Sequence, residues 1–391
     1  MQHYHYIFTG SGLAALMTVY EMILSGKFED KTILLIDENT KKNNDRTWCF
    51  WDNSNQFDEI VSKKWDVALF ADATFQRDLK LHPYQYKMVR GLDFYNLVFD
   101  LISEQKNIHF ANQKVVDFDE LGNHCVVKTE SQSYTCNKIF NSIYNPNLVK
   151  NQSKYPLLQQ HFIGWFIKSK EEVFDKNKAT FMDFSVEQKG NTRFMYVLPT
   201  SSTEALLEYT LFSKDLLSKE EYENEIQNYI QKLGITEYKI IEKEQGNIPM
   251  TCYAFWKHNT KNIINIGSIG GWTKASTGYT FANTIKKSKA LVAFLSKDTS
   301  PEISGSLSET DLRKFHKIDK FWFYDLLFLD VLFKNNELGS KVFPALFKKG
   351  NPTLIFKFLD EETTLWEDLQ VIWKCPKKPF LKAFFKRLLS F

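Results

Sequence analysis

The chain has 391 residues, enough for a large core divided into two closely packed parts with a helical extension. Its 50 basic and 47 acidic side chains leave a formal charge of +3, so nucleic acid is not expected as a partner. The five cysteines are odd in number and form no C-x-x-C pair, and the histidines show no ligand spacing, so neither a disulfide framework nor a metal site is expected.

The first elements along the chain predict a βαβ unit. Residues 4–9 are an apolar strand, and a glycine-rich turn follows directly. The next residues repeat apolar side chains with helical spacing as far as Gly26, which suits a helix end. A second short apolar strand covers residues 33–36. This order of strand, turn, helix and strand is typical of nucleotide-binding folds.

The glycine turn gives this unit its chemistry. Gly10 permits the tight turn, Gly12 lets the backbone approach a pyrophosphate, and Ala15 replaces the third glycine of the pattern. Asp37, at the end of the second strand, can accept hydrogen bonds from an adenosine ribose. The alternative is an ordinary glycine turn before a helix. The strand context and Asp37 favour a dinucleotide.

The middle of the chain is rich in strands. Residues 114–139 are predicted to form a meander, and residues 162–210 to hold further strands. A helix follows, and its start at Ser218, with Glu221 three residues later, fits a capping box. This block predicts a substrate-binding domain inserted between two parts of a cofactor-binding domain.

A second glycine-rich segment lies far downstream, after the short apolar strand 263–266. Its candidate backbone contacts are Gly267, Gly270, Gly271, Thr277 and Gly278. A helix is predicted to begin near residue 280. Two such backbone surfaces so far apart in sequence suggest one long cofactor held from both ends, and FAD is the cofactor that we expect.

Together these elements predict an α/β fold with three parts. A Rossmann-like FAD-binding domain is expected from residues 1–150 and 245–300. A mainly antiparallel β substrate-binding domain is expected as an insertion at residues 151–244. Residues 301–391 show helical spacing interrupted by glycine and proline, which predicts a C-terminal helical region.

Residues 45–51, D-R-T-W-C-F-W, resemble a block that the bacterial lycopene β-cyclases of carotenoid biosynthesis carry after their dinucleotide fingerprint. Other segments are similar to that family in the same order: F-M-D-F at 181–184, Y-V-L-P at 196–199, L-E-Y-T at 207–210, G-N-I-P-M at 246–250, and a block at 267–281 that ends T-G-Y-T-F. The resemblance therefore extends over nearly the whole chain.

This resemblance implies a flavoprotein of the glutathione-reductase and hydroxylase type that works with reduced FAD, the flavin being reduced by NAD(P)H or another donor. It implies lycopene and γ-carotene as substrates, whose acyclic ends are closed into β-rings to give β-carotene without net electron transfer. Aromatic hydroxylases of that group carry G-D-A-A-H where this chain has G-S-I-G at 267–270. The missing aspartate and histidine weigh against a hydroxylase.

Such a reaction needs a carboxylic acid that stays neutral in a dry, apolar tunnel, because only the neutral form can protonate an alkene. Glu208 is the first candidate, since it follows two leucines in a strand and matches the family's glutamate in L-[IL]-E-x-T. Asp183 is the second candidate, as a base or as a partner that tunes Glu208. The alternatives are a solvated strand glutamate and a strand-end aspartate. Tyr209 stands where plant relatives have a second glutamate, so no role of that acid transfers.

Two further features carry charge. Arg46 and Arg90 are expected to contact the FAD diphosphate or ribose, by family position and charge; the alternative is a pair of surface arginines. The segment F-L-D-E-E-T at 358–363 looks like the plant motif around the acid. It lies in the helical C-terminal region, so we interpret it as a helix start with a solvated face.

The chain is expected to touch a membrane without crossing it. The N-terminus shows no signal-peptide pattern, and the longest apolar stretch, 321–333, contains two aspartates and is too short to span a bilayer. The stretch 379–391 is amphipathic and basic, which suits a helix on an anionic membrane surface or a helix docked on the protein core. We expect a cytoplasmic protein bound peripherally to the cytoplasmic membrane. The sequence does not indicate its oligomeric state.

Two other functions fit the same residues. A flavin-dependent hydroxylase or reductase acting on another apolar isoprenoid would consume NADPH with each product formed. A non-catalytic carotenoid or flavin carrier would return lycopene unchanged. Removing the carboxyl of Glu208 would distinguish a carrier from a cyclase, because only acid catalysis requires this group.

Overall fold

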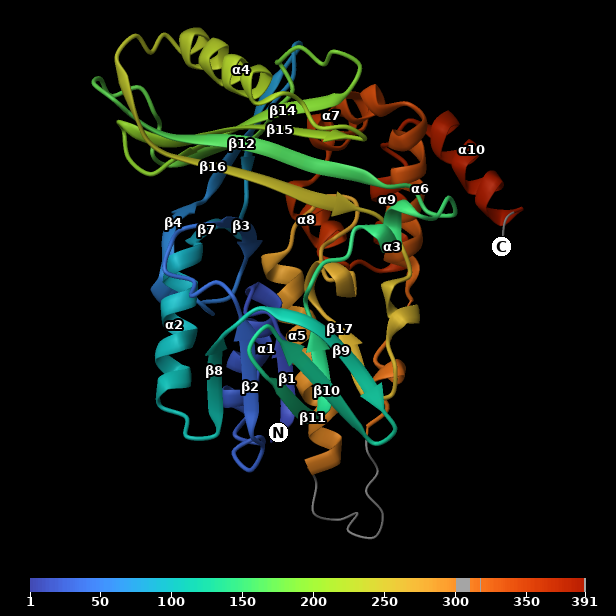
Figure 1. Cartoon of the computed structure of the whole chain (residues 1–391). Coiled ribbons are helices and arrows are strands. Elements are labelled where there is room, and N and C mark those ends of the chain that lie inside the picture. The colour runs from blue at the N-terminus through green and yellow to red at the C-terminus, as the bar shows by residue number, and fades with distance from the viewer. Residues whose placement is uncertain (300–309, 317, 390–391) are drawn as a thin grey trace.

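The computed structural model describes residues 1–299, 310–316 and 318–389. Within these residues two large sheets lie one above the other and a small third sheet stands between them (Figure 1). The predicted boundary at residue 300, and Ser390 and Phe391 of the expected amphipathic stretch, fall outside the described residues.

The first large sheet is Rossmann-like and has the order β8-β2-β1-β11-β10-β9, with β17 pairing with β11. Its strands are β1 (Gln2–Thr9), β2 (Ile33–Asp37), β8 (Ile108–Asn112), β9 (Val115–Leu121), β10 (His124–Thr129), β11 (Ser133–Asn141) and β17 (Ile263–Asn265). Five of them run parallel, and β9 and β10 add an antiparallel pair. The predicted opening strands and the predicted meander are confirmed.

Helices cover one face of this sheet because successive strand residues point to opposite faces. Phe8 and Leu35 pack with α1 (Leu13–Ser25), α2 (Gly91–Ser103) and α5 (Phe281–Leu295), whereas Ile7 and Leu34 pack against the β9–β10 meander. Helix α1 ends at Gly26, whose φ of 64° is left-handed, as the sequence predicts.

The second large sheet has the order β16-β12-β15-β14-β13-β5-β6 and is mainly antiparallel, with one parallel pair between β13 and β5. Its strands are β5 (Val67–Ala71), β6 (Gln76–Lys80), β12 (Leu158–Ser169), β13 (Lys178–Asp183), β14 (Thr192–Pro199), β15 (Glu204–Ser213) and β16 (Tyr238–Met250). Helix α4 (Lys219–Lys232) covers its outer face (Figure 1). The Ser218 side chain caps α4 by accepting from the Glu221 amide, but the Glu221 carboxylate binds Arg193, so only half of the predicted capping box forms.

The sheets divide the chain differently from the expected ranges at two points. Strands β5 and β6 come from the segment expected in the cofactor-binding part, yet β5 pairs with β13, and Ala68 and Phe70 bury their side chains in the core of the second sheet. Strand β16 continues to Met250 and stays paired with β12, so no structural break occurs at residue 244.

The third sheet joins the two large ones. It consists of β3 (Thr47–Asp52), β7 (Gln85–Arg90) and β4 (Val61–Trp65) in the order β3-β7-β4. Strand β3 carries the aromatic block of residues 45–51. Its Phe50 ring stacks on Phe281 at the start of α5, with centroids 4.7 Å apart, and its Trp51 ring meets Tyr279 at 4.6 Å.

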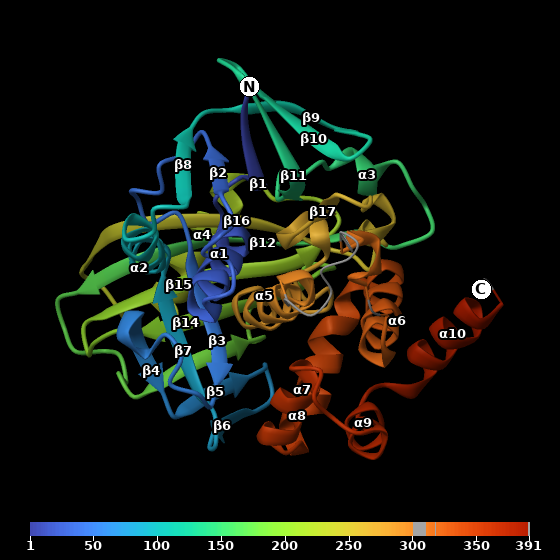
Figure 2. The same ribbon diagram turned by 90° about the horizontal axis from the view of Figure 1, so that it is seen from below.

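The C-terminal helices pack beside the inner face of the second sheet (Figure 2). They are α6 (Lys320–Lys334), α7 (Gly339–Lys349), α8 (Pro352–Leu359), α9 (Leu365–Ile372) and α10 (Lys377–Leu388); a short helix, α3 (Asn147–Lys150), lies earlier in the chain. Phe347 of α7 stacks on Phe70 of β5 with centroids 4.7 Å apart. Within the described residues, no helix combines the length and apolarity needed to cross a bilayer. The chain therefore has an α/β fold with a Rossmann-like part, a mainly antiparallel β part and a helical C-terminal region.

Candidate functional site

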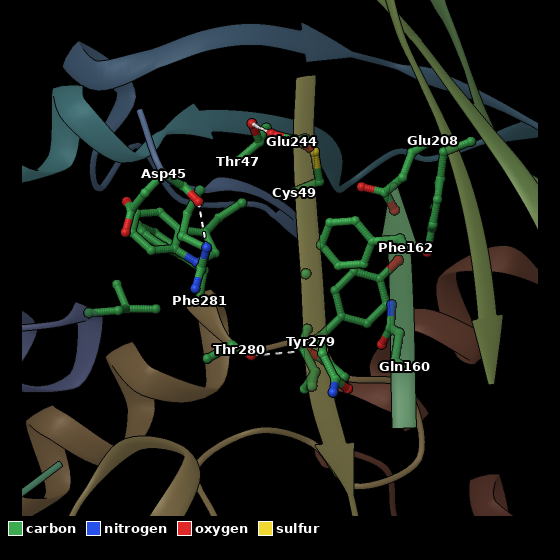
Figure 3. Close-up of a pocket in the computed structure, with 18 of the residues that line it drawn as sticks. Asp45, Thr47, Cys49, Gln160, Phe162, Glu208, Glu244, Tyr279, Thr280 and Phe281 are labelled. Carbon is green, nitrogen blue, oxygen red and sulfur yellow. Dashed lines mark hydrogen bonds between the residues drawn. The ribbon is translucent and has the colours of Figure 1, made fainter. Parts of the chain in front are cut away.

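A cavity of about 350 Å³ lies between the carboxyl edge of the first sheet and the inner face of the second (Figure 3). Alternation along the strands decides which side chains of the second sheet reach it. The residues that face the cavity are Gln160, Phe162, Tyr196, Leu198, Leu206, Glu208, Glu244, Gly246 and Ile248. Their neighbours Ile163, Trp165, Val197, Leu207 and Tyr209 instead pack under α4.

The two glycine-rich segments lie next to each other at the edge of the first sheet. A Cβ atom on Gly267 would lie 3.1 Å from the Cβ of Ala14, in the first turn of α1. Gly10 makes the tight turn with φ of 104°, which disfavours other residues. Gly12 lines the cavity, Ala15 is fully buried, and no side chain caps the start of α1. The free amides of that first turn therefore face the cavity edge as an anion site.

Asp37 braces the glycine turn. Its Oδ2 accepts hydrogen bonds from the Ser11 amide at 2.7 Å and the Ser11 hydroxyl at 3.0 Å, and its Oδ1 accepts from the Asn39 amide at 2.8 Å. The Lys41 ammonium lies 3.6 Å from the same Oδ2, and because a carboxylate has about four acceptor positions, a ribose hydroxyl would compete with Lys41 for the last one. Its role toward a ribose stays a prediction.

One buried polar atom, Gln160 Oε1, marks where a polar ring edge would fit. Gln160 Oε1 has no hydrogen-bond partner within the described part of the chain, whereas the Tyr279 hydroxyl lies within hydrogen-bonding reach of the Tyr86 and Tyr196 hydroxyls; both belong to cavity-lining residues. Thr277 and Gly278 line the cavity beside them. A Cβ on Gly278 would lie 1.7 Å from Gln160 Oε1, so only glycine fits there. A buried acceptor without a partner is rare, and a donor on a flavin ring edge would satisfy Gln160 Oε1.

Of the other predicted cofactor contacts, Arg46 lines this cavity, whereas Arg90, Gly270 and Gly271 do not. Arg46 lines it and is exposed, with its guanidinium donating to the Asp45 carbonyl. Arg90 does not line it: its guanidinium binds both carboxylate oxygens of Glu242, at 2.6 and 2.7 Å. Gly270 and Gly271 line a smaller neighbouring cavity. The contacts of these residues with FAD stay predictions, and for Arg90 the ion pair with Glu242 is what the structure supports.

Glu208 reaches the cavity from β15, and its side chain points toward the rings of Phe162 and Tyr279 (Figure 3). Its Oε1 accepts a hydrogen bond from the Thr210 hydroxyl at 2.6 Å. Burial, and then the charge of Glu244, raise the pKa of Glu208 from 4.5 to about 8. Glu208 is therefore a carboxyl that keeps its proton near neutral pH, which the acid of the predicted reaction requires.

Glu244 is a second cavity carboxyl, and the sequence motifs did not single it out. Its Oε2 accepts from the Thr47 hydroxyl at 2.6 Å, a bond that joins β16 to β3 (Figure 3). Burial raises the pKa of Glu244 from 4.5 to about 7, although the Thr47 hydroxyl and the Arg90 charge lower it. The signal in the sequence was its spacing, two and four residues before Gly246 and Ile248, which places all three on one face of a strand.

Asp183 does not reach the cavity. It lies at the end of β13, is 7% exposed, accepts from the Tyr229 hydroxyl of α4 at 2.7 Å, and accepts from the Ser185 amide at 2.8 Å. The Tyr229 bond fixes α4 to the outer face of the sheet, and the Ser185 bond closes the turn after β13. The expectation that Asp183 acts as a base or tunes Glu208 does not fit this position, and the strand-end alternative does.

Two of the three acids at residues 360–362, Asp360 and Glu361, are not part of a solvated face, so that interpretation is wrong for them, whereas Glu362 is exposed. They lie in the turn between α8 and α9, and the helix start comes later, at the Thr364 cap. Asp360 accepts from the Trp51 indole at 2.7 Å, and Glu361 binds the buried Lys274 ammonium at 2.9 Å. Their partners lie in distant parts of the chain, so local spacing could not reveal them.

The comparisons with known proteins agree with this geometry. Residues 6–384 match a protein family described as "Lycopene cyclase protein". This chain belongs to the lycopene cyclase family. A chromoplastic capsanthin/capsorubin synthase of Citrus sinensis is 26% identical over 229 residues, which are 52% of this chain and 44% of that protein. The chain thus spans less than half the length of that relative.

Solved structures share the fold at low sequence identity. A geranylgeranyl bacteriochlorophyll reductase-like protein of Thermoplasma acidophilum superposes with a TM-score of 0.66 at 11% identity, covering 98% of this chain and 96% of the other. The flavin-dependent brominase Bmp2 has a TM-score of 0.59 at 11% identity over the full length of both chains. The halogenase PltM, solved with FAD, has a TM-score of 0.60 at 10% identity, covering 94% of this chain and 83% of the other.

Proposed function

We propose that this protein is a lycopene β-cyclase, which closes the acyclic ends of lycopene and γ-carotene into β-rings to give β-carotene. The observation that carries the proposal is the position of Glu208: a carboxyl with a raised pKa, in an aromatic cavity beside two adjacent glycine-rich segments. Membership of the lycopene cyclase family supports the same conclusion.

The reaction begins with the neutral carboxyl of Glu208. Its proton is transferred to the terminal alkene of the substrate, the electron pair of the neighbouring alkene forms the ring bond, and loss of a ring proton leaves the ring double bond. One proton enters and one leaves, so no electrons are gained or lost. The faces of Phe162 and Tyr279 line the cavity and stabilise the cation formed in between. Their apolar surface also excludes water, which would otherwise capture that cation.

The cofactor that we propose is reduced FAD, with NAD(P)H or another donor as its reductant. The uncapped start of α1 and the adjacent segment around Gly267 would hold its phosphates, while Gln160 Oε1 would pair with a donor on the edge of its ring. When bound, the reduced flavin supplies negative charge beside the developing cation. The FAD complexes among proteins of this fold support the assignment.

We also propose a peripheral position on the cytoplasmic membrane, where an apolar polyene resides. Helix α10 docks on α6 through the ion pair of Arg387 with Asp330. One face of α10 therefore packs on the protein, as the alternative of a docked helix predicts. The opposite side leaves apolar residues in solvent, and α9 adds two tryptophans that are 71% and 72% exposed, Trp366 and Trp373. Lys377 lies 3.6 Å from the centroid of the Trp373 ring. Exposed aromatics beside lysines are typical of helices that bind anionic membrane surfaces.

The direct test is pigment analysis in a lycopene-accumulating bacterium that expresses this chain. Conversion to β-carotene is expected, and γ-carotene alone would indicate that one end is accepted. The matched controls are Glu208→Gln and Glu204→Gln on the same strand, where the Glu204 carboxylate pairs with Lys168 outside the cavity. Unchanged lycopene in cells that hold folded, flavin-loaded protein would refute the proposal, and hydroxylated or hydrogenated products would identify the hydroxylase or reductase instead.

A further inference from the structure

Two glutamates face each other across a single glycine of the second sheet. Gly164 of β12 pairs with Glu208 of β15 on one side and with Glu244 of β16 on the other. Neighbouring strands lie about 4.8 Å apart, so the two backbones are separated by roughly 10 Å. A Cβ on Gly164 would lie 3.2 Å from Glu244 Cγ and 3.5 Å from Glu208 Cβ. Both side chains therefore stand on the cavity face, one on each side of the space that the missing Gly164 side chain leaves.

A third group, the Cys49 thiol, lies near both carboxyls. The Cys49 thiol of β3 lines the same cavity. Burial, and then the charges of Glu208 and Glu244, raise the pKa of this thiol. The two carboxyls thus belong to one site, with Cys49 as a neutral neighbour.

The two carboxyls differ in their partners. Arg90 Nη1 donates to Thr47 Oγ1 at 3.1 Å, so the single hydroxyl hydrogen of Thr47 is available for Glu244. This relay from Arg90 through Thr47 supplies Glu244 with a donor backed by a positive charge. Glu208 instead accepts from the neutral hydroxyl of Thr210. Burial raises the pKa of both carboxyls, but the Thr47 relay helps to keep that of Glu244 at about 7, below the value of about 8 for Glu208, so Glu244 ionises first as the pH rises.

We propose that the carboxylate of Glu244 takes the ring proton in the last step of the reaction. The inference rests on the proposed cyclisation. Glu208 gives its proton to the terminal alkene carbon and becomes a carboxylate; the ring C–H bond breaks, its electron pair becomes the ring double bond, and the proton passes to Glu244. Glu244 then releases its proton to the solvent and Glu208 takes one from the solvent, so one proton enters and one leaves for each ring and the cycle consumes no oxidant or reductant.

The test is Glu244→Gln in flavin-loaded protein, assayed with lycopene in D₂O. The amide keeps an acceptor for Thr47 but cannot take a proton, and a positioned base contributes about 10²- to 10⁴-fold to a rate. We expect β-ring formation to fall at least about 100-fold. Because Glu208 still protonates the substrate, deuterium is expected in the recovered lycopene, or in ring isomers with a displaced double bond.

Three results would overturn this assignment. The first is β-ring formation by Glu244→Gln within about tenfold of the unsubstituted protein, since a base is worth more than that. The second is a loss of rings with unlabelled lycopene and no isomers, which would place Glu244 in the protonation step. Glu244→Asp, which keeps a carboxylate, is expected to form more β-rings than Glu244→Gln; equal loss would contradict the proposal even if the amide variant folds poorly. Failure of the proposed function is distinct, because then the unsubstituted protein itself forms no rings.

Discussion

Glu208→Gln should inactivate the protein and stabilise it at the same time. A carboxyl whose pKa rises from 4.5 to about 8 on folding opposes folding whenever the solvent would ionise it. Each pKa unit corresponds to about 1.4 kcal/mol, so the free energy lost at pH 7 is about 3 kcal/mol at most. Cavity water and charge sharing with Glu244 reduce this figure. The amide carries no charge and keeps an acceptor for Thr210.

The sign of the effect depends on pH. The folded-state pKa is raised, so the contribution of Glu208 to stability is fully present below pH 4.5 and is lost as the pH rises through about 8. The stability gained by Glu208→Gln should therefore be under about 1 kcal/mol at pH 5 and largest at pH 8. Denaturant unfolding at the two pH values measures it, with Glu204→Gln as a control that changes little at either.

The cyclisation rate should depend on the protonation state of Glu208. The cyclisation rate is expected to fall as the pH rises through about 8, because the acid loses its proton. Glu208→Gln should lower the rate by about 10²- to 10⁴-fold while flavin stays bound. A variant that is no more stable than the unsubstituted protein at pH 8, or that is shifted equally at pH 5 and pH 8, would refute the argument that this carboxyl is held neutral by its surroundings.

Three further predictions test other parts of the structure. Gly278→Ala places a Cβ on a buried amide oxygen at a φ of 73°, so flavin content measured by absorbance should fall sharply; normal loading would contradict the assigned ring edge. Lys274→Met removes the cation that pairs with the buried Asp325 and the half-buried Glu361 and should cost about 3–5 kcal/mol in denaturant unfolding, whereas Lys286→Met breaks a surface pair and should cost less than about 1 kcal/mol. Replacing Trp366 and Trp373 by serine should weaken co-sedimentation with anionic vesicles without lowering the melting temperature, and unchanged binding would exclude α9 from the membrane contact.

Local patterns were enough to predict much of the first sheet, because the strand, turn and helix at the N-terminus depend on neighbouring residues only. Glu208 was predicted from its place in a strand after two leucines and from the resemblance of residues 207–210 to a family segment, and it lines the cavity. Local patterns do not predict the order of the strands within a sheet. Gly164 brings Glu208 and Glu244 together only because β12 lies between β15 and β16.

Tertiary partners explain the expectations that failed. Asp183 occupies a strand in a family-like segment, but the parity of its position turns it toward Tyr229 of α4 rather than the cavity. The acids at 360–362 have a composition that suits a solvated turn, yet Lys274 and Trp51, 87 and 309 residues away in sequence, take Glu361 and Asp360 as partners. Segments β5 and β6 join the second sheet because their buried side chains complete its core. None of these contacts has a local signal.

The most direct test of the central claim is cyclisation of lycopene by purified, flavin-loaded protein in D₂O, with the reductant measured alongside the carotenoids. Acid-initiated cyclisation predicts one deuterium in each β-ring and no reductant consumed in proportion to product. Rings without deuterium, or products that appear in step with reductant consumption, would contradict it.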